Sequence, residues 1–153
     1  MTIQLTSPAF GEGQPIPKRH SCDGEDLSPV LKWTNAPENT MSFALICDDP
    51  DAPMGTWVHW VLFNLPPETA ELVEGVPAQP EGPDGAKQGI SDFKRPGYGG
   101  PCPPPGKPHR YYFKLYALDT MLELKDKATK RDLEKAMEDH ILAKGQLMGT
   151  YKR

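Results

Sequence analysis

The sequence predicts one domain of the mainly β class with few helices, and three observations support this prediction. Several segments show the apolar or alternating pattern of strands, whereas only one shows the period of an amphipathic helix. The 153 residues also include 18 prolines and 14 glycines. Because these residues interrupt helices and central strands, they favour short strands joined by many loops.

The clearest strand in chain order is the nearly continuous apolar segment Met41–Cys47. A short apolar run of this kind is typical of a strand that is buried on both faces. Two shorter strands are expected at Leu31–Trp33 and Gln146–Lys152.

Two further segments, Trp57–Leu65 and His109–Leu118, show the period of two residues that is typical of strands. Since successive strand residues point to opposite faces, alternation assigns each side chain to a face. In the first segment one face is expected to carry Trp57, His59, Val61 and Phe63. In the second, one face carries His109, Tyr111, Phe113 and Leu115, and the other carries Arg110, Tyr112, Lys114 and Tyr116.

The helix is expected from Lys130 to about Lys144. Thr129 and Asp132 form the pattern of a capping box at its start, and Gly145 offers a left-handed residue at its end. A stripe with the helical period runs through Leu133, Ala136, Met137 and Ile141.

Composition excludes several classes of protein. A chain with 37% hydrophobic and 25% charged residues is too balanced for intrinsic disorder. The net charge of −4 argues against a nucleic-acid module, which needs a basic surface. No apolar run is long enough to span a bilayer, and the first residues lack a signal-peptide pattern. We therefore expect residues 1–153 to form a single cytoplasmic domain without integral membrane association.

The three cysteines show neither zinc-ribbon spacing nor the framework of a disulfide-rich secreted domain. Cys47 lies in an apolar segment and is expected to be a buried free thiol. Cys22 and Cys102 lie in loops rich in glycine and proline, and whether they form a disulfide stays open at this point.

The segment Pro77–Pro108 holds nine of the prolines and seven of the glycines. A flexible linker is one interpretation. However, the segment is not repetitive and contains Phe93, Tyr98 and Cys102, which linkers rarely use. Since long ordered loops within a domain are usually functional, we interpret it as an ordered functional loop.

Polar groups that a packed core would not favour gather at three places, Asp48–Pro53, Trp57–Trp60 and His109–Tyr111. Taken singly, the first is an ordinary acidic turn and His59 is a hydrogen-bonded core histidine. Asp49 and Ala52 both precede proline, which holds their backbone extended and fixes the turn. If the strands that carry His59 and His109 are neighbours, both rings meet beside this turn.

This arrangement suits a site for an anion. Two imidazoles supply donors, and a nearby carboxylate favours their charged form. Gly99, Gly100 and Pro101 offer a backbone that a ligand can approach closely, while Trp57 and Tyr111 supply apolar walls.

The same residues are also compatible with three alternatives to simple binding. Asp49, Asp51, His59 and His109 form a set that suits a metal such as zinc or iron, although no HExxH-like spacing is present. Cys102 and His109 could pair as nucleophile and base in a hydrolase. The stiff loop of Pro77–Pro108 could instead present itself to a serine protease as an inhibitor.

Three motifs resemble those of the phosphatidylethanolamine-binding protein family, in particular its bacterial and archaeal branch, described as Raf kinase inhibitor-like. They are DPDAP at 49–53, WVHW at 57–60 and GPCPPPGKPHRY at 100–111. The segments Cys22–Trp33 and Gly149–Arg153 are also similar to that branch. The resemblance covers essentially the whole chain.

The resemblance implies an antiparallel β-sandwich with a large central sheet, a smaller sheet and a helix in the C-terminal region. It also implies a non-enzymatic protein without cofactor or metal, with a pocket for phosphate-like anions or phospholipid head groups. Kinases, serine proteases and a second copy of the chain are the protein partners that it suggests. The ligand-binding residues would be Asp49, Ala52, Pro53, Trp57, His59, Gly100, Pro101, His109 and Tyr111.

Overall fold

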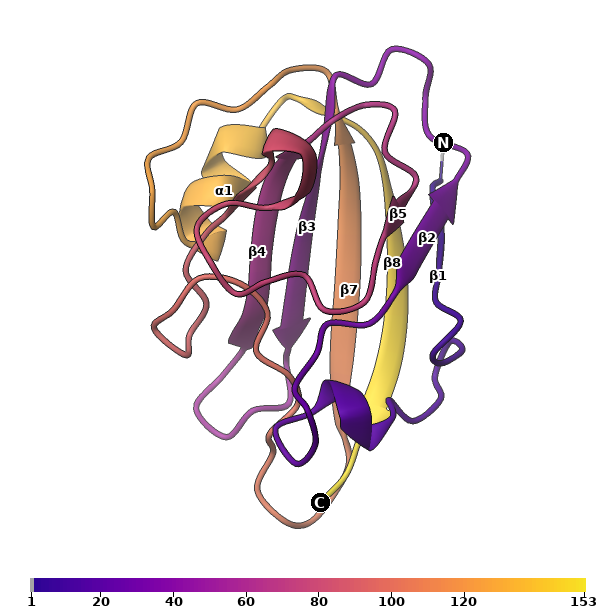
Figure 1. Cartoon of the computed structure of the whole chain (residues 1–153), viewed down its shortest axis with the longest axis vertical. Coiled ribbons are helices and arrows are strands. Elements are labelled where there is room, and N and C mark those ends of the chain that lie inside the picture. The colour runs from indigo at the N-terminus through magenta and orange to yellow at the C-terminus, as the bar shows by residue number, and fades with distance from the viewer. Residues whose placement is uncertain (1) are drawn as a thin grey trace.

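Two antiparallel sheets form the framework of the computed structural model, which describes residues 2–153 (Figure 1). Within these residues the larger sheet has five strands in the order β6-β4-β3-β7-β8, and the smaller has three in the order β1-β2-β5. The strands are β1 (Gln4–Thr6), β2 (Leu31–Thr34), β3 (Ser42–Asp49), β4 (Trp57–Leu65), β5 (Glu71–Leu72), β6 (Lys87–Gln88), β7 (His109–Leu118) and β8 (Ile141–Tyr151). The helix α1 spans Lys130–Met137, and short 3₁₀ turns occupy Lys18–His20 and Pro83–Gly85. The expected mainly β class with two antiparallel sheets is confirmed.

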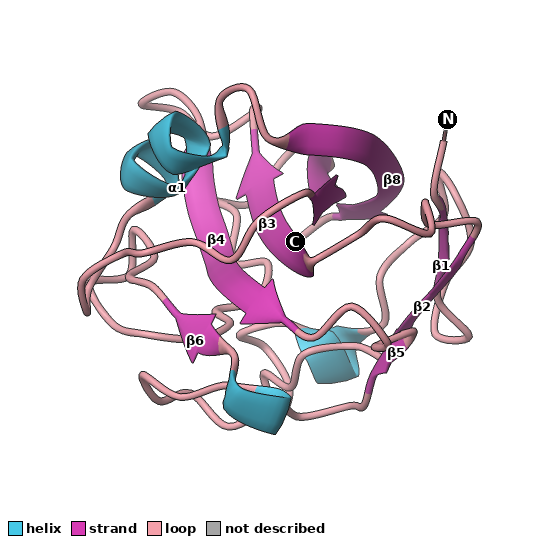
Figure 2. Cartoon of the chain, turned by 90° about the horizontal axis from the view of Figure 1, so that it is seen from above, coloured by secondary structure: helices cyan, strands magenta, loops and turns pink. Residues whose placement is uncertain are grey.

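The larger sheet is covered on both faces. Seen from above, α1 and the small sheet lie on opposite sides of it (Figure 2). The core between the two sheets includes Leu45, Phe113 and Leu147, while the core under α1 includes Ile46 and Leu133. This explains why the apolar run of β3 has no polar alternation, since every residue of β3 is buried. Each large side chain buried in this way contributes roughly 1.5–3 kcal/mol.

The strand β4 does not keep the simple alternation that the sequence predicts. Cys47 pairs with Trp60 whereas Asp48 pairs with Val58, so His59 is an extra residue in a β-bulge. Beyond the bulge the faces are exchanged: Trp60 and Leu62 lie in the core between the sheets, and Val61 and Phe63 lie under α1. The expectation that His59, Val61 and Phe63 share one face is therefore wrong.

The helix is shorter than predicted, and the last strand is longer. The capping box of Thr129 and Asp132 is present, but α1 ends at Met137, and Asp139 follows with a φ of 65°. Ile141 does not continue the helical stripe; it begins β8, which pairs with β7 along nearly its whole length.

Gly145 is not a left-handed helix end, because it lies inside β8. A Cβ at Gly145 would lie 2.3 Å from the carbonyl oxygen of Ile3, and one at Gly149 would meet the side chains of Ile16 and Phe10. Glycine at these two positions lets the N-terminal segment approach β8 closely. It also removes two apolar side chains from the buried face, which conceals the strand pattern in the sequence.

The proline-rich segment Pro77–Pro108 is ordered and anchored by a buried side chain. The Gln88 amide nitrogen donates to the carbonyl oxygens of Pro77, Gln79 and Glu81 at 2.8–3.1 Å. Its carbonyl oxygen accepts a hydrogen bond of 2.7 Å from the Trp60 indole. The linker interpretation is thus excluded.

The disulfide that the sequence left open is formed between Cys22 and Cys102, whereas Cys47 is free and buried as expected. Among residues 2–153, no helix is long and apolar enough to cross a membrane.

Candidate functional site

A cavity of about 260 Å³ opens where β3 ends and β4 and β7 begin. Of the nine residues expected at a binding site, all except Gly100 and Pro101 line it. The residues in its wall are Asp49, Ala52, Pro53, Trp57, His59, Phe93, Cys102, Pro103, Pro104, His109 and Tyr111. The strands β4 and β7 are not adjacent in the sheet, because β3 lies between them, yet both histidines reach the same cavity. His59 and His109 therefore stand on either side of Asp49, the last residue of β3.

Asp49 organises the acidic turn and orients one histidine. Its side chain is 4% exposed, and Oδ2 lies 2.7 Å from Nδ1 of His109. Its other oxygen, Oδ1, accepts the backbone N–H of Asp51 at 2.7 Å. An ionised carboxylate only accepts hydrogen bonds, so the His109 ring carries its proton on Nδ1 in this contact. The Nε2 atom of His109 is left for a ligand.

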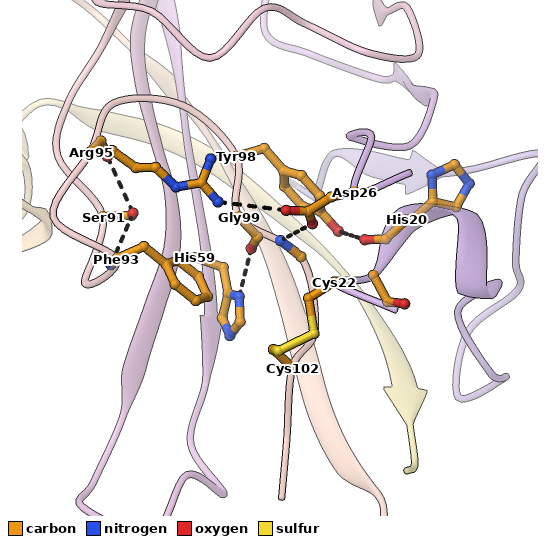
Figure 3. Close-up of polar contacts among 12 residues, drawn as sticks. His20, Cys22, Asp26, His59, Ser91, Phe93, Arg95, Tyr98, Gly99 and Cys102 are labelled. Carbon is orange, nitrogen blue, oxygen red and sulfur yellow. Dashed lines mark hydrogen bonds and ion pairs between the residues drawn. A yellow bond between two sulfur atoms is a disulfide. The ribbon is translucent and has the colours of Figure 1, made fainter. Parts of the chain in front are cut away.

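His59 is held by a reciprocal pair of hydrogen bonds to the proline-rich segment. Its Nδ1 lies 2.7 Å from the Gly99 carbonyl oxygen (Figure 3), and its own carbonyl accepts the Gly99 N–H at 2.9 Å. A carbonyl oxygen only accepts, so Nδ1 carries the proton and Nε2 is the remaining nitrogen. The ring stacks edge-to-face against Phe93 and Tyr111.

Burial lowers the pKa of His59, and this outweighs the hydrogen bond to Gly99 and the nearby carboxylates. The carboxylate was expected to favour the charged form of both rings, but for His59 desolvation prevails. In the free protein at neutral pH, His59 is therefore neutral, with Nε2 as an acceptor.

The backbone of Gly99–Pro101 does not offer free N–H groups to a ligand. The Gly99 N–H donates to His59, and the Gly100 N–H donates to Asp26 Oδ1 at 2.8 Å. The Pro101 carbonyl accepts the Cys22 N–H at 3.0 Å. This segment is bonded to His59 and Asp26 (Figure 3), so the backbone N–H groups of Gly99 and Gly100 that were expected to contact an anion are already in use.

Tyr111 brings a hydroxyl group into the same cavity. The side chain is buried, and its oxygen, which lies near the Asp49 carboxylate, makes no hydrogen bond of normal geometry among residues 2–153. Burial, followed by the charge of Asp49, raises the pKa of Tyr111 well above its usual value. The hydroxyl thus keeps its proton, and a buried donor without a partner is costly unless a ligand or water accepts from it.

The sequence profile of the family described as phosphatidylethanolamine-binding protein matches residues 6–152. The chain belongs to the phosphatidylethanolamine-binding protein family.

Relatives and solved structures of this family are similar over nearly the full length. A protein of Methanothermobacter thermautotrophicus is 50% identical over 151 residues, covering 99% of both chains. A homologue of known structure from Chlamydia trachomatis is 43% identical, with a TM-score of 0.91, and the match covers 99% of this chain and 98% of that one. Escherichia coli YbcL, described as a member of the mammalian family, is 33% identical with a TM-score of 0.92, covering 100% and 99%.

Four lining residues of this family member were not predicted as ligand-binding, namely Phe93, Cys102, Pro103 and Pro104. Phe93 stands against both Trp57 and His59, with ring centroids 5.6 and 5.3 Å apart. It is placed by Asp92, which exchanges two hydrogen bonds with the backbone of Val58 at the start of β4. An aromatic residue inside a proline- and glycine-rich segment was the only signal in the sequence.

The geometry does not assemble the two catalytic alternatives. The Asp51 carboxylate turns away from the cavity and binds Arg110 through both oxygens. Across residues 2–153, no three histidine, cysteine or acidic side chains are grouped so that they could hold a metal ion. Cys102 is bonded to Cys22, so it has no thiol to act as a nucleophile beside His109.

Proposed function

We propose that this family member is a non-enzymatic binding protein whose cavity takes a phosphate-type anion, including the phosphate of a phospholipid head group. The observation that carries the proposal is the set of groups left without protein partners. Within residues 2–153, Nε2 of His59, Nε2 of His109 and the hydroxyl of Tyr111 all belong to lining residues and have no hydrogen bond. Each can bond to a phosphate oxygen or hydroxyl.

Protonation decides which anion fits best. Because Nε2 of neutral His59 is an acceptor, it needs a proton from the ligand or from solvent when an anion binds. A phosphate monoester has a second pKa near 6 and carries a P–OH group in its monoanionic form. Sulfate and the phosphodiester of a phospholipid head group carry no proton near neutral pH, so each binds only with a proton that His59 takes up from solvent. The site therefore favours phosphate over sulfate.

The walls of the cavity suit the uncharged part of such a ligand. Pro53, Trp57, Pro103 and Pro104 line it with apolar surface, and Trp57 is 37% exposed. A volume of about 260 Å³ is at the small end for ligand sites, so it matches a head group rather than a complete lipid.

Titration with phosphate or phosphorylethanolamine, followed through the histidine ring NMR signals, tests the proposal. The His59 and His109 signals should shift and saturate at millimolar ligand. His140 is a matched control, since it is exposed and paired with Asp119 outside the cavity. Unchanged His59 and His109 signals would refute the proposal.

Serine protease inhibition is a second candidate, favoured by the anchoring of the exposed loop 104–108. The disulfide holds Cys102 at the base of this loop, and Nη1 of Arg153 donates to the Pro103 carbonyl at 3.4 Å. A loop fixed at its base loses little entropy on docking. Incubation with a panel of serine proteases tests this candidate function. An absence of inhibition at micromolar protein would exclude it. A kinase partner, homodimer formation and a cytoplasmic location stay predictions.

A further inference from the structure

A buried carboxylate on the face of the large sheet opposite the cavity described above binds two lysines. The Asp48 side chain is 2% exposed, and its Oδ2 atom lies 3.2 Å from Nζ of Lys114 and 2.8 Å from Nζ of Lys130. Lys114 comes from the middle of β7, and Lys130 is the first residue of α1. One carboxylate balances one ammonium group, so this cluster keeps one unit of positive charge.

Arg110 extends the cluster along β7, and its own charge is balanced. Its Nε and Nη2 atoms donate to the two oxygens of Asp51 at 2.9 and 2.8 Å. Its Nη1 atom donates to the Tyr112 hydroxyl at 3.2 Å. The guanidinium group is thereby held in one orientation beside the two lysines.

These groups share a second cavity, of about 380 Å³. It is lined by Asp48, Pro50, Thr56, Arg110, Tyr112, Lys114, Lys130 and Gln146. Each lysine ammonium has three N–H groups, yet among residues 2–153 each has one hydrogen-bonding partner, the Asp48 carboxylate. The cavity thus combines unused donors with an excess of positive charge.

A purely structural role accounts for one lysine but not for both. The bond from Lys130 ties the start of α1 to β3, and it already neutralises Asp48. The side chains of Lys114 and Lys130 are only 31% and 22% exposed. Bringing a second ammonium group partly out of water costs free energy. The Tyr112 ring, 5.7 Å from Nζ of Lys114, offsets part of this cost, but among residues 2–153 no second carboxylate forms an ion pair with either lysine. An anion in the cavity would restore the balance.

We propose that Lys114, Lys130 and Arg110 form a second oxyanion site, which takes a phosphate group either as free phosphate or as a monoester. Phosphate oxygens accept strong charge-assisted hydrogen bonds from ammonium and guanidinium groups. The site is independent of the first cavity, because it lies on the other face of the sheet and uses none of its residues.

Titration of ¹⁵N-labelled protein with inorganic phosphate, and separately with phosphoserine, at constant ionic strength tests this site. The amide signals of Tyr112, Lys114 and Lys130 should shift and saturate. Saturation with phosphoserine alone identifies a monoester as the ligand, and saturation with both shows that free phosphate suffices. Changing either lysine to glutamine should weaken binding about tenfold, as expected for one charge-assisted bond.

Matched variants distinguish binding at this site from binding elsewhere on the protein and from loss of the fold. Lys130→Gln and Lys114→Gln each leave one lysine to balance Asp48, so the fold should persist, and either variant suffices if the other unfolds. Lys32→Gln should bind within twofold of the unchanged protein, because Lys32 is 57% exposed on β2 of the small sheet and lies 3.4 Å from Glu71. His59→Gln removes a group of the first cavity and tells which site causes a given shift. Shifts that do not saturate, or that survive both lysine changes, overturn the proposal.

Discussion

Asp48 and Asp49 are consecutive residues at the end of β3 whose carboxylates serve opposite faces of the same sheet. Asp49 accepts from His109 inside the first cavity, and Asp48 accepts from Lys114 and Lys130 on the face that carries α1. Both are almost completely buried; Asp49 has one basic partner at hydrogen-bonding distance and Asp48 has two. Period-two alternation thus gives one short segment two separate electrostatic roles.

Binding of phosphate to the first cavity should depend on pH through His59. Burial lowers the His59 pKa below its usual value of 6.5, so the free protein holds this ring neutral at pH 7. Since an anion favours the protonated ring, affinity should rise as pH falls from 8 to 6, by up to about tenfold per unit for one linked proton. Calorimetry in buffers of different ionisation enthalpy measures the proton uptake directly.

The variant His59→Gln provides the control, because glutamine does not titrate. In this variant, the only remaining pH dependence of the affinity should come from protonation of the ligand. The difference between the pH profiles of the two proteins is therefore the contribution of His59. Identical profiles for the two proteins would contradict the assignment.

Replacing Tyr111 with phenylalanine should separate binding from stability. The hydroxyl makes no hydrogen bond of normal geometry among residues 2–153, and the nearby Asp49 carboxylate keeps its bonds to His109 and Asp51, so removal of the hydroxyl leaves no protein group unsatisfied. The free energy of unfolding should stay the same or rise slightly, whereas phosphate affinity should fall about tenfold through loss of one donor. Denaturant unfolding measures the free energy of unfolding, and calorimetric titration measures the phosphate affinity. A clear loss of stability would show that the hydroxyl bonds within the protein.

The disulfide between Cys22 and Cys102 should support both the fold and the cavity. It closes a loop with a sequence separation of 80, and a cross-link of this kind contributes about 2–4 kcal/mol. Because Cys102 lines the cavity, the double variant Cys22→Ser/Cys102→Ser should also bind phosphate more weakly. The phosphate affinity of the unchanged protein after reduction of the disulfide is a second measurement. Equal affinity of the oxidised protein, the reduced protein and the double variant would exclude a role of the disulfide in binding.

The sequence predicted the positions of side chains most accurately where the alternation within a single strand determines them. The alternation of β7 correctly places Tyr111 and Phe113 in the core and Arg110 and Lys114 on the other face. The bulge at His59 could not be predicted, since it arises from pairing with β3 rather than from β4 itself. The extent of β8 was concealed by Gly145 and Gly149, which are required by segments more than a hundred residues away.

Motifs placed most of the candidate site, but they could not show how its backbone is used. The N–H groups of Gly99 and Gly100 are taken by His59 and Asp26, which come from distant parts of the chain. Only the folded arrangement shows that side chains, and not this backbone, are left for a ligand.

The ion pair of Asp51 and Arg110 should stabilise the protein in a defined pH range. Hydrogen bonds from the Arg110 side chain are the largest cause that lowers the pKa of Asp51 from 3.8 to about 2. A carboxylate with a depressed pKa contributes stability that is complete above its unfolded pKa and is lost as pH falls through the folded value. The contribution should therefore be present at pH 7 and disappear between about pH 4 and pH 2.

Asp51→Asn should accordingly lower the melting temperature by a few degrees at pH 7, a modest effect because solvent screens the pair. The difference from the unchanged protein should vanish near pH 2. Asp126→Asn is the matched control, since Asp126 is 79% exposed and lies 3.9 Å from Lys87. It should change the melting temperature little at either pH. A constant difference between Asp51→Asn and the unchanged protein from pH 7 to pH 2 would mean that the turn is held by neutral hydrogen bonds instead of by charge.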